Sequence, residues 1–404
     1  DQYVFHAHHP EFKVGYSWDQ KAKLAKISVK QEQKVDENVM LFQLSLPIRF
    51  RVGDQSIDRS MPITKASEDF YFALPSAPEV VRIDPELTIL AKTTFAPPNA
   101  MIHAQLTDPE DVIGRLLAVE LLGKRKDQIT VDKLKEVLNK DSFHGVRLAA
   151  SKALRGIGSE AAFKALTGST KQPDARVRRQ VVTDLGSFYK PEALAVLKKS
   201  LGGEKNPAVR AAAIRALPGF GDAGADGLVR QALVSTSFRH ELADAAVSAL
   251  RKQDDPANLA ILLKALLEDS KKFSSRGYGS GMRALAYLAR NEEDKSKVRR
   301  FLLDRASHLN ARIRLAAIDS LGQLGDPKAI ATLEKFAAGG EGSPERRNAE
   351  AAIEKLRAVR KPVDDFKNLR QEVTDLKKAN ENLGKQLDDL KKRFEAAAIP
   401  EAKK

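Results

Sequence analysis

The side chains best suited to chemistry are the seven histidines and the carboxylates near them, and one such group has the spacing of metal ligands. In His240-Glu241-Leu242-Ala243-Asp244 an imidazole and a carboxylate stand four residues apart, on one face of a helix, as zinc ligands do in H-E-x-x-H motifs. A catalytic zinc site of that kind also needs a glutamate further along the chain, and Leu262 and Leu263 stand where it would be. We therefore predict a structural helix here and no metal site.

The other histidines are weaker candidates, because no spacing supplies a complete set of metal ligands. They are His6, His8 and His9 near the start of the chain and the isolated His103, His144 and His308. The chain has no cysteine, which excludes disulfides, thiolate zinc sites and cysteine nucleophiles. Nothing resembles a phosphate-binding glycine loop or a nucleophile elbow. The sequence therefore predicts no catalytic, metal or cofactor site in this chain.

A repeated pattern would place side chains regularly through the middle of the chain. Each copy has an Asp or Asn, then a Val-Arg or Ile-Arg pair, then alanines and other apolar residues. The four clearest copies are 141–150, 174–182, 206–214 and 310–318. The first three arginines recur at spacings of 31 and 32 residues, and a second apolar segment follows each copy. A period of this length, made of two helices, predicts an α-solenoid over residues 107–360.

The pattern resembles HEAT-like repeats, in which the Asp or Asn caps the second helix and the valine enters the core. That resemblance implies that the arginine reaches an acidic cap of a neighbouring repeat and builds an internal ladder, a role we prefer to ligand binding. The ladder residues are Arg147, Arg178, Arg210 and Arg314. Within the degenerate stretch 239–300, Phe273–Gly281 is predicted to be a long loop between helices. The alternative is a flexible insertion on a binding face.

The first hundred residues predict strands. Large apolar residues alternate with polar ones, and short segments rich in Gly, Pro or polar residues separate the runs. The predicted strands are 12–18, 24–33, 41–52, 70–74, 80–83, 87–90 and 93–95. The expected fold is mainly α with an N-terminal all-β module: an antiparallel β-sandwich over 1–100, the HEAT-like solenoid and a C-terminal coiled-coil helix.

Five motifs in the β module carry a family resemblance. They are His9-Pro10-Glu11-Phe12, Tyr16-Ser17-Trp18-Asp19, Ile27-Ser28-Val29-Lys30-Gln31, Phe72-Ala73-Leu74-Pro75 and Val81-Arg82-Ile83-Asp84-Pro85. They resemble the β-sandwich that follows the catalytic domain in M1-family zinc aminopeptidases, and in the related TAF2-like transcription-factor subunits. In that family a helical region, often of HEAT-like repeats, comes next.

The resemblance also implies where the catalytic motifs of the family would lie. The zinc signature and the exopeptidase motif of the family lie upstream of the sandwich, so zinc is implied only for a catalytic domain outside this chain. Gly202-Gly203-Glu204-Lys205-Asn206 faintly resembles the exopeptidase motif. We predict it to be a turn in which glycines end one helix and the asparagine caps the next.

Pro362 ends the predicted solenoid, and residues 363–397 carry a heptad pattern. The a positions are Phe366, Val373, Asn380, Leu387 and Phe394, and the d positions are Leu369, Leu376, Leu383 and Leu390. A single Asn at an a position selects two strands, and a parallel arrangement makes the g-to-e′ pairs attractive. Those pairs are Asp365 with Arg370 and Glu372 with Lys377. We predict a parallel homodimeric coiled coil; the alternative is a lone helix folded back on the solenoid.

The formal net charge of +14 is concentrated in the solenoid, where residues 107–362 contain 46 Lys and Arg against 32 Asp and Glu. A basic solenoid could attract nucleic acid, anionic lipid or an acidic protein, or it could be a solvated, lysine-rich surface. With six Tyr, one Trp and no basic stretch interleaved with aromatics, nucleic-acid binding is disfavoured. No apolar run reaches the length of about 18 residues that a membrane span needs.

Two functional interpretations follow. In the favoured one, the chain is the non-catalytic C-terminal region of an M1-like zinc aminopeptidase: it supports the absent N-terminal catalytic domain, shapes access of peptide substrate and mediates oligomerisation. In the alternative, it is an autonomous HEAT-repeat scaffold that binds a protein or anionic partner through its basic solenoid. The start Asp1-Gln2-Tyr3, without Met, favours a fragment or a processed product. The coding sequence upstream of Asp1 distinguishes the two interpretations.

Overall fold

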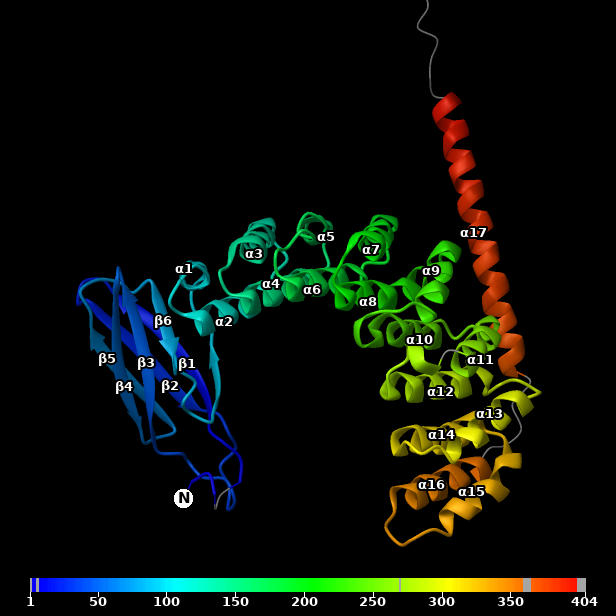
Figure 1. Cartoon of the computed structure of the whole chain (residues 1–404). Coiled ribbons are helices and arrows are strands. Elements are labelled where there is room, and N and C mark those ends of the chain that lie inside the picture. The colour runs from blue at the N-terminus through cyan, green and yellow to red at the C-terminus, as the bar shows by residue number, and fades with distance from the viewer. Residues whose placement is uncertain (1, 5–6, 269, 359–364, 398–404) are drawn as a thin grey trace, which may run out of the picture. The chain divides into compact units, whose positions relative to one another are not determined.

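The computed structural model describes residues 2–4, 7–268, 270–358 and 365–397, which fall into two compact units, Asp1–Phe220 and Gly221–Lys404. The first unit contains the β module and the first helices, and the second contains the later helices (Figure 1). The predicted fold class is therefore confirmed for the β module and the helical series. The final segment is a helix, and its pairing stays a prediction.

The β module is a sandwich of two sheets. Its strands are β1 (Glu11–Asp19), β2 (Leu24–Gln31), β3 (Leu44–Val52), β4 (Gln55–Ile63), β5 (Ser67–Ala73), β6 (Val80–Ile83) and β7 (Lys92–Phe95). One sheet has the order β5-β2-β1-β7 and the other β4-β3-β6. Alternate residues of both sheets, among them Phe12, Ile27, Ile48 and Phe50, point inward and share one core.

Three details of the sandwich differ from the sequence prediction. The β1–β7 pair is parallel, although the other described strand pairs are antiparallel. Strand β4 was not predicted, because only its last residues alternate between buried and exposed; Gly53, with φ 59°, makes the turn that pairs it with β3. The predicted strand 87–90 is a loop, because the Asp84 carboxylate accepts hydrogen bonds from the backbone N–H groups of Thr88 and Ile89.

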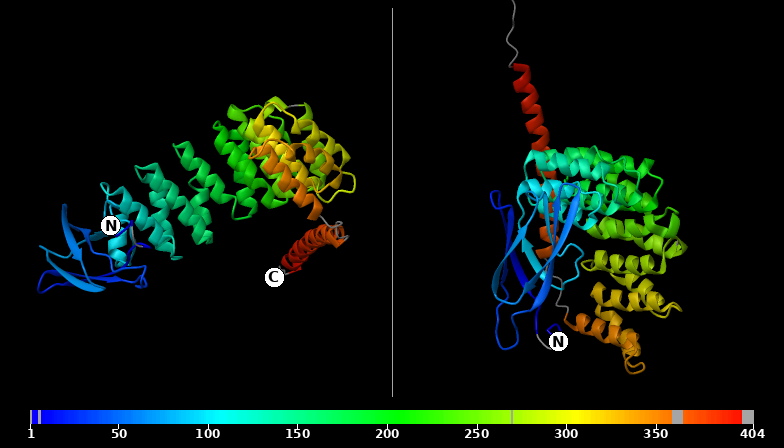
Figure 2. Two further views of the ribbon diagram at one scale, coloured as in Figure 1. Left: turned by 90° about the horizontal axis from the view of Figure 1, so that it is seen from below. Right: turned by 90° about the vertical axis from the view of Figure 1, so that its left-hand side faces the viewer.

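The helices of the first unit form a double row. They are α1 (Asn99–Leu106), α2 (Val112–Leu122), α3 (Gln128–Lys140), α4 (His144–Ile157), α5 (Glu160–Thr167), α6 (Ala175–Leu185), α7 (Pro191–Gly203), α8 (Pro207–Ala216) and the short 3₁₀ helix η1 (Leu217–Phe220). The even-numbered helices α2, α4, α6 and α8 pack in succession, and each also contacts an odd-numbered partner (Figure 2). Asp174 and Asn206 cap α6 and α8, as the repeat pattern predicts, and Asp111, which lies outside the predicted copies, caps α2.

The second unit repeats this arrangement. Its helices are α9 (Ala223–Leu233), η2 (Phe238–His240), α10 (Glu241–Gln253), η3 (Pro256–Asn258), α11 (Leu259–Glu268), η4 (Ser270–Lys272), α12 (Ser275–Ala289), α13 (Ser296–Ala306), α14 (Ala311–Leu324), η5 (Pro327–Ala329), α15 (Ile330–Ala337), α16 (Pro344–Ala358) and α17 (Asp365–Ala397). Helices α10, α12, α14 and α16 pack in succession. Asn310 caps α14, as predicted.

The prediction of a loop at Phe273–Gly281 is wrong, because α12 begins at Ser275 and Ser274 caps it. Glycine has a low helix propensity, but three buried glycines let neighbouring helices approach α12 closely. A Cβ on Gly277 would collide with the Asp244 carboxylate on α10, and one on Gly281 would lie 2.7 Å from a Leu266 methyl on α11. Packing therefore decides the structure of this segment.

A glycine near the end of an even-numbered helix lies against an alanine thirty residues later, on the next even-numbered helix. The pairs are Gly123 with Ala153, Gly186 with Ala216 and Gly322 with Ala352. An added Cβ would come within 3.1, 2.5 and 2.9 Å of the respective alanine Cβ. These small residues fix the close spacing of successive repeats.

Candidate interaction surfaces

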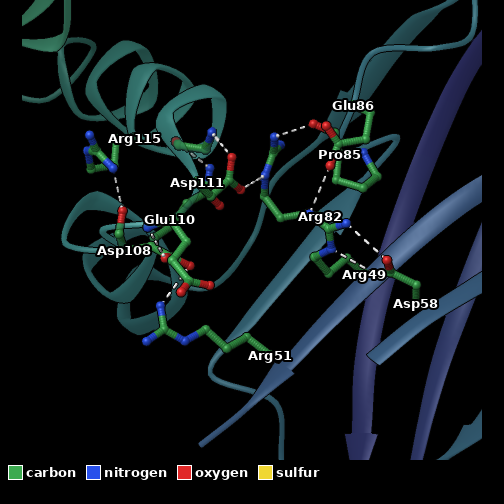
Figure 3. Close-up of polar contacts among 12 residues, drawn as sticks. Arg49, Arg51, Asp58, Arg82, Pro85, Glu86, Asp108, Glu110, Asp111 and Arg115 are labelled. Atoms are coloured by element: carbon green, nitrogen blue, oxygen red, sulfur yellow. Dashed lines mark hydrogen bonds and ion pairs between the residues drawn. The ribbon is translucent and has the colours of Figure 1, made fainter. Parts of the chain in front are cut away.

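A buried ion pair joins the sandwich to the first helix pair (Figure 3). Arg82, on β6, has a side chain that is only 5% exposed, and its Nε donates to Asp111 Oδ2 at 2.6 Å. The Asp111 carboxylate also accepts from the Gly114 backbone N–H at 2.6 Å, so it caps α2 at the same time. Arg51 adds a second link to Asp108 at 2.7 Å. One carboxylate thus fixes both the strand and the helix.

The hollow beside this joint, of about 290 Å³, offers little for catalysis. Three arginines line it: Arg49, Arg51 and Arg82. Each is already engaged with a carboxylate, and Arg49 binds both Asp58 at 2.7 Å and Glu86 at 3.0 Å (Figure 3). Because these charges satisfy one another, we interpret the hollow as part of the structural joint.

Three arginines of the helix rows share one contact geometry. On one edge, Nη1 of Arg178 donates to the carbonyl oxygens of Gln172 and Pro173, both at 2.8 Å. On the other edge, Nε donates to Glu204 Oε2 at 2.7 Å, which links α6 to the loop before α8. Arg115 has the same two sets of contacts: Nη1 donates to the carbonyl oxygens of Asp108 and Pro109, and Nε donates to the Asp141 carboxylate. In Arg314, Nη1 donates to the carbonyl oxygens of His308 and Leu309, and Nε donates to the Glu345 carboxylate. The hydrogen bonds from Arg178 and Arg314 lower the pKa of Glu204 and Glu345.

The other two predicted ladder arginines make different contacts. Arg147 reaches only the neutral Gln172 amide oxygen, at 3.5 Å, and its buried Nε has no hydrogen-bond partner among the described residues. Arg210 donates from Nε to the Leu201 carbonyl at 3.0 Å. The sequence prediction missed Arg115, although it follows the cap Asp111 by four residues, the offset that also separates Asp174 from Arg178.

Comparison with known families agrees with this repeat geometry. The sequence model for HEAT repeats matches residues 100–184, 146–218, 170–237, 203–274 and 282–354, which together make up more than half of the chain. The chain belongs to the HEAT-repeat family. No curated protein matches the sequence.

Two solved structures resemble this HEAT-repeat chain weakly. Legionella pneumophila aminopeptidase A, solved in complex with aspartic acid, has 11% identity and a TM-score of 0.45; the match covers 86% of this chain and 49% of that one. Human deoxyhypusine hydroxylase, in complex with glycerol, has 18% identity and a TM-score of 0.28, with coverages of 64% and 95%. The chain thus spans about half the length of the aminopeptidase.

The candidate metal-binding histidines do not assemble a site in the described part of the chain. His240 lies at the start of α10 with φ 60°, and no group of three or more His, Asp or Glu side chains among the described residues could hold a metal ion. Asp244 instead accepts a hydrogen bond from the hydroxyl of Ser274, the cap of α12, at 2.8 Å. His6 lies outside the described residues. No described helix is long and apolar enough to cross a membrane.

The predicted coiled-coil residues fall on α17, a helix of 33 residues. Described seam residues on it are Val373, Leu376, Leu383, Leu387 and Leu390, which are 46%, 62%, 61%, 56% and 58% exposed, and Asn380, which is also exposed. The side chains of Phe366, Leu369 and Phe394 lie outside the described residues. A helix with this stripe presents an apolar surface to solvent.

Helices α4, α6 and α8 of the first unit are basic on their exposed side, whereas α2 exposes Glu120. Helices α4, α6 and α8 carry Lys152, Arg155, Arg179 and Arg215 as exposed residues. Their one carboxylate, Asp184, is fully buried and accepts hydrogen bonds from Ser151 at 2.6 Å and Gln180 at 2.9 Å. Burial raises the pKa of this carboxyl.

Proposed function

We propose that this HEAT-repeat chain is the non-catalytic sandwich-and-solenoid region of an M1-like zinc aminopeptidase. In this role the sandwich supports a catalytic domain and the helix rows shape the access of peptide substrate. The proposal is carried by the position of the motifs that resemble the M1 sandwich. His9–Phe12 leads into β1, and Val81–Pro85 contains Arg82, whose side chain makes the joint to the first helix pair.

The joint supports this role physically. A region that braces a catalytic domain has to transmit a fixed orientation from the sandwich to the helices, and loop contacts alone would leave the two free to move. The Arg82–Asp111 pair removes that freedom, because it is largely buried and shared with the cap of α2. No catalytic residue of this chain is required.

The decisive experiment starts with the coding sequence upstream of Asp1. We expect an H-E-x-x-H motif with a downstream glutamate, and the longer protein should bind about one zinc per chain and hydrolyse aminoacyl-coumarin substrates. The 404-residue chain, assayed with added zinc as the matched control, should be inactive. A start codon just upstream, or a longer protein without zinc or activity, would overturn the proposal.

A second role, as a scaffold for an acidic protein segment, is favoured by the basic side of α4, α6 and α8. We propose a partner rich in Asp and Glu, because these helices expose cations and no carboxylate in the part of the chain that the structure describes. Polyglutamate should bind the chain more weakly as salt rises, and Lys152→Glu with Arg179→Glu should reduce the affinity several-fold. Lys164→Glu on α5 is the control. Equal effects of all three substitutions would contradict a localised binding face.

A further inference from the structure

We propose that α17 joins two copies of this chain by forming a parallel, two-stranded coiled coil. This inference is independent of the proposed enzymatic role. It starts from the apolar side chains of α17, of which five described ones are about half exposed. Together with Asn380 they recur at alternating steps of three and four residues, the period of a coiled-coil seam. A helix that packs on a globular core normally has a wider apolar stripe.

The described surface of the helix rows gives no matching place for α17 to fold back. The large exposed apolar residues of the helix rows are Ile129, Phe143, Tyr189, Val234, Phe238, Leu267 and Leu309. Except for Val234 and Phe238 they lie far apart in the sequence, and none of them repeats at the three-and-four spacing of the α17 stripe. Single exposed apolar side chains are normal on soluble proteins and do not form a groove. A second copy of α17, in contrast, supplies a stripe of identical length and spacing. We therefore assign the seam to a second copy.

Two polar features of α17 set the arrangement. Asn380 is the one polar residue in an otherwise apolar seam, and in a parallel, in-register pair the two Asn380 amides meet and can hydrogen-bond to each other. Glu372 at g and Lys377 at e then face each other between the chains, on both sides of the pair. An antiparallel pair would bring Lys377 close to another e position, which is basic or glycine in this helix.

The first experiment measures the mass of the full chain by sedimentation equilibrium. We expect about twice the chain mass of 44.4 kDa at micromolar concentration. Leu376→Asp should raise the dissociation constant roughly 100- to 1,000-fold, because each helix loses a buried leucine and gains a charge. A surface control on the same helix, Lys378→Asp at an outward position, should stay dimeric. A monomeric wild-type chain would overturn the proposal.

The second experiment tests whether the two α17 helices are parallel. Because the chain has no native cysteine, an introduced cysteine can form a disulfide only with another introduced cysteine. In a parallel, in-register pair, Leu376→Cys at d and Leu387→Cys at a should each form a disulfide with its own counterpart. An antiparallel pair would instead cross-link efficiently only in a mixture of the two variants. Fast cross-linking restricted to that mixture would refute the parallel arrangement.

The third experiment uses charge reversal and does not touch the apolar seam. Glu372→Lys should weaken the dimer several-fold by placing lysines opposite each other, and Glu372→Lys with Lys377→Glu should restore it. Circular dichroism should show the same helix content in all variants, so that a change in mass reports association and not unfolding. Failure of the double variant to recover would contradict the g-to-e′ pairing.

Discussion

Replacing Arg178 by methionine tests the ladder geometry most directly. Methionine keeps much of the apolar stem but removes all donors. The change leaves Glu204, whose side chain is only 13% exposed, without its cation, and leaves the carbonyls of Gln172 and Pro173 without donors. Breaking a fully buried pair costs about 3–5 kcal/mol; because Arg178 is 23% exposed and Glu204 keeps a hydrogen bond from the Asn206 N–H, we expect a loss of about 2 kcal/mol.

The matched control is Arg176→Met, two residues away on the same helix. Arg176 also contacts a carboxylate, Asp174, at 2.6 Å, and its hydrogen bond holds the pKa of that carboxyl well below the ordinary value. Its side chain is 58% exposed, however, so solvent screens the pair and the substitution should have little effect. Urea denaturation followed by circular dichroism measures both variants. Equal shifts of the urea midpoint in the two variants would refute the reasoning that burial, and not contact distance, decides how much an ion pair contributes to the free energy of unfolding.

Three further predictions concern the joint, the packing and a buried acid. Arg82→Met should destabilise the first unit by about 3 kcal/mol, because it leaves Asp111 largely buried and unpaired, and urea denaturation should show it. Gly322→Ala should lower the thermal midpoint, because the added Cβ would lie 2.9 Å from the α16 backbone. The control Gly227→Ala, on α9, adds a Cβ in open space and should leave the midpoint unchanged or raise it slightly. The pKa of Asp184 is higher in the folded protein than in the unfolded chain, so its contribution to stability is greatest below the unfolded pKa of about 3.9 and is lost as the pH rises through the folded pKa. The unfolding free energy should therefore fall as the pH rises from about 4 to about 7. Asp184→Asn should make this decrease smaller.

The repeat architecture could be predicted because its signals are local. A cap and an arginine four residues later recur along the chain, and the structure places the caps Asp174, Asn206 and Asn310 at helix starts. Helix α4 departs from this rule: Phe143 occupies its cap position, and the Asp141 carboxylate accepts from the Phe143 N–H while pairing with Arg115. The predicted cap Asp141 therefore serves the ladder, while another residue occupies the cap position of α4.

The errors come from segments whose structure depends on distant contacts. Strand β4 is mostly exposed, so the alternation that marks a half-buried strand is absent from most of it, and only pairing with β3 defines it. Helix α12 begins with a sequence rich in glycine, and the reason for that composition is the close approach of Asp244 and Leu266 from other helices. Local propensity carries no information on either contact.

The acidic partners of the ladder were the hardest part to predict, for a geometric reason. The arginine is fixed by its helix, but the position of its carboxylate varies. For Arg115 and Arg178 it lies 26 residues later, between two helices, and for Arg314 it is Glu345, 31 residues later, in the first turn of α16. The planar guanidinium tolerates this variation because its two edges bind independently, one to loop carbonyls and the other to the acid. A lysine presents its donors from a single nitrogen and could not serve both edges at the same separation. The contacts of Arg115, Arg178 and Arg314 therefore join successive helix pairs and do not require a ligand.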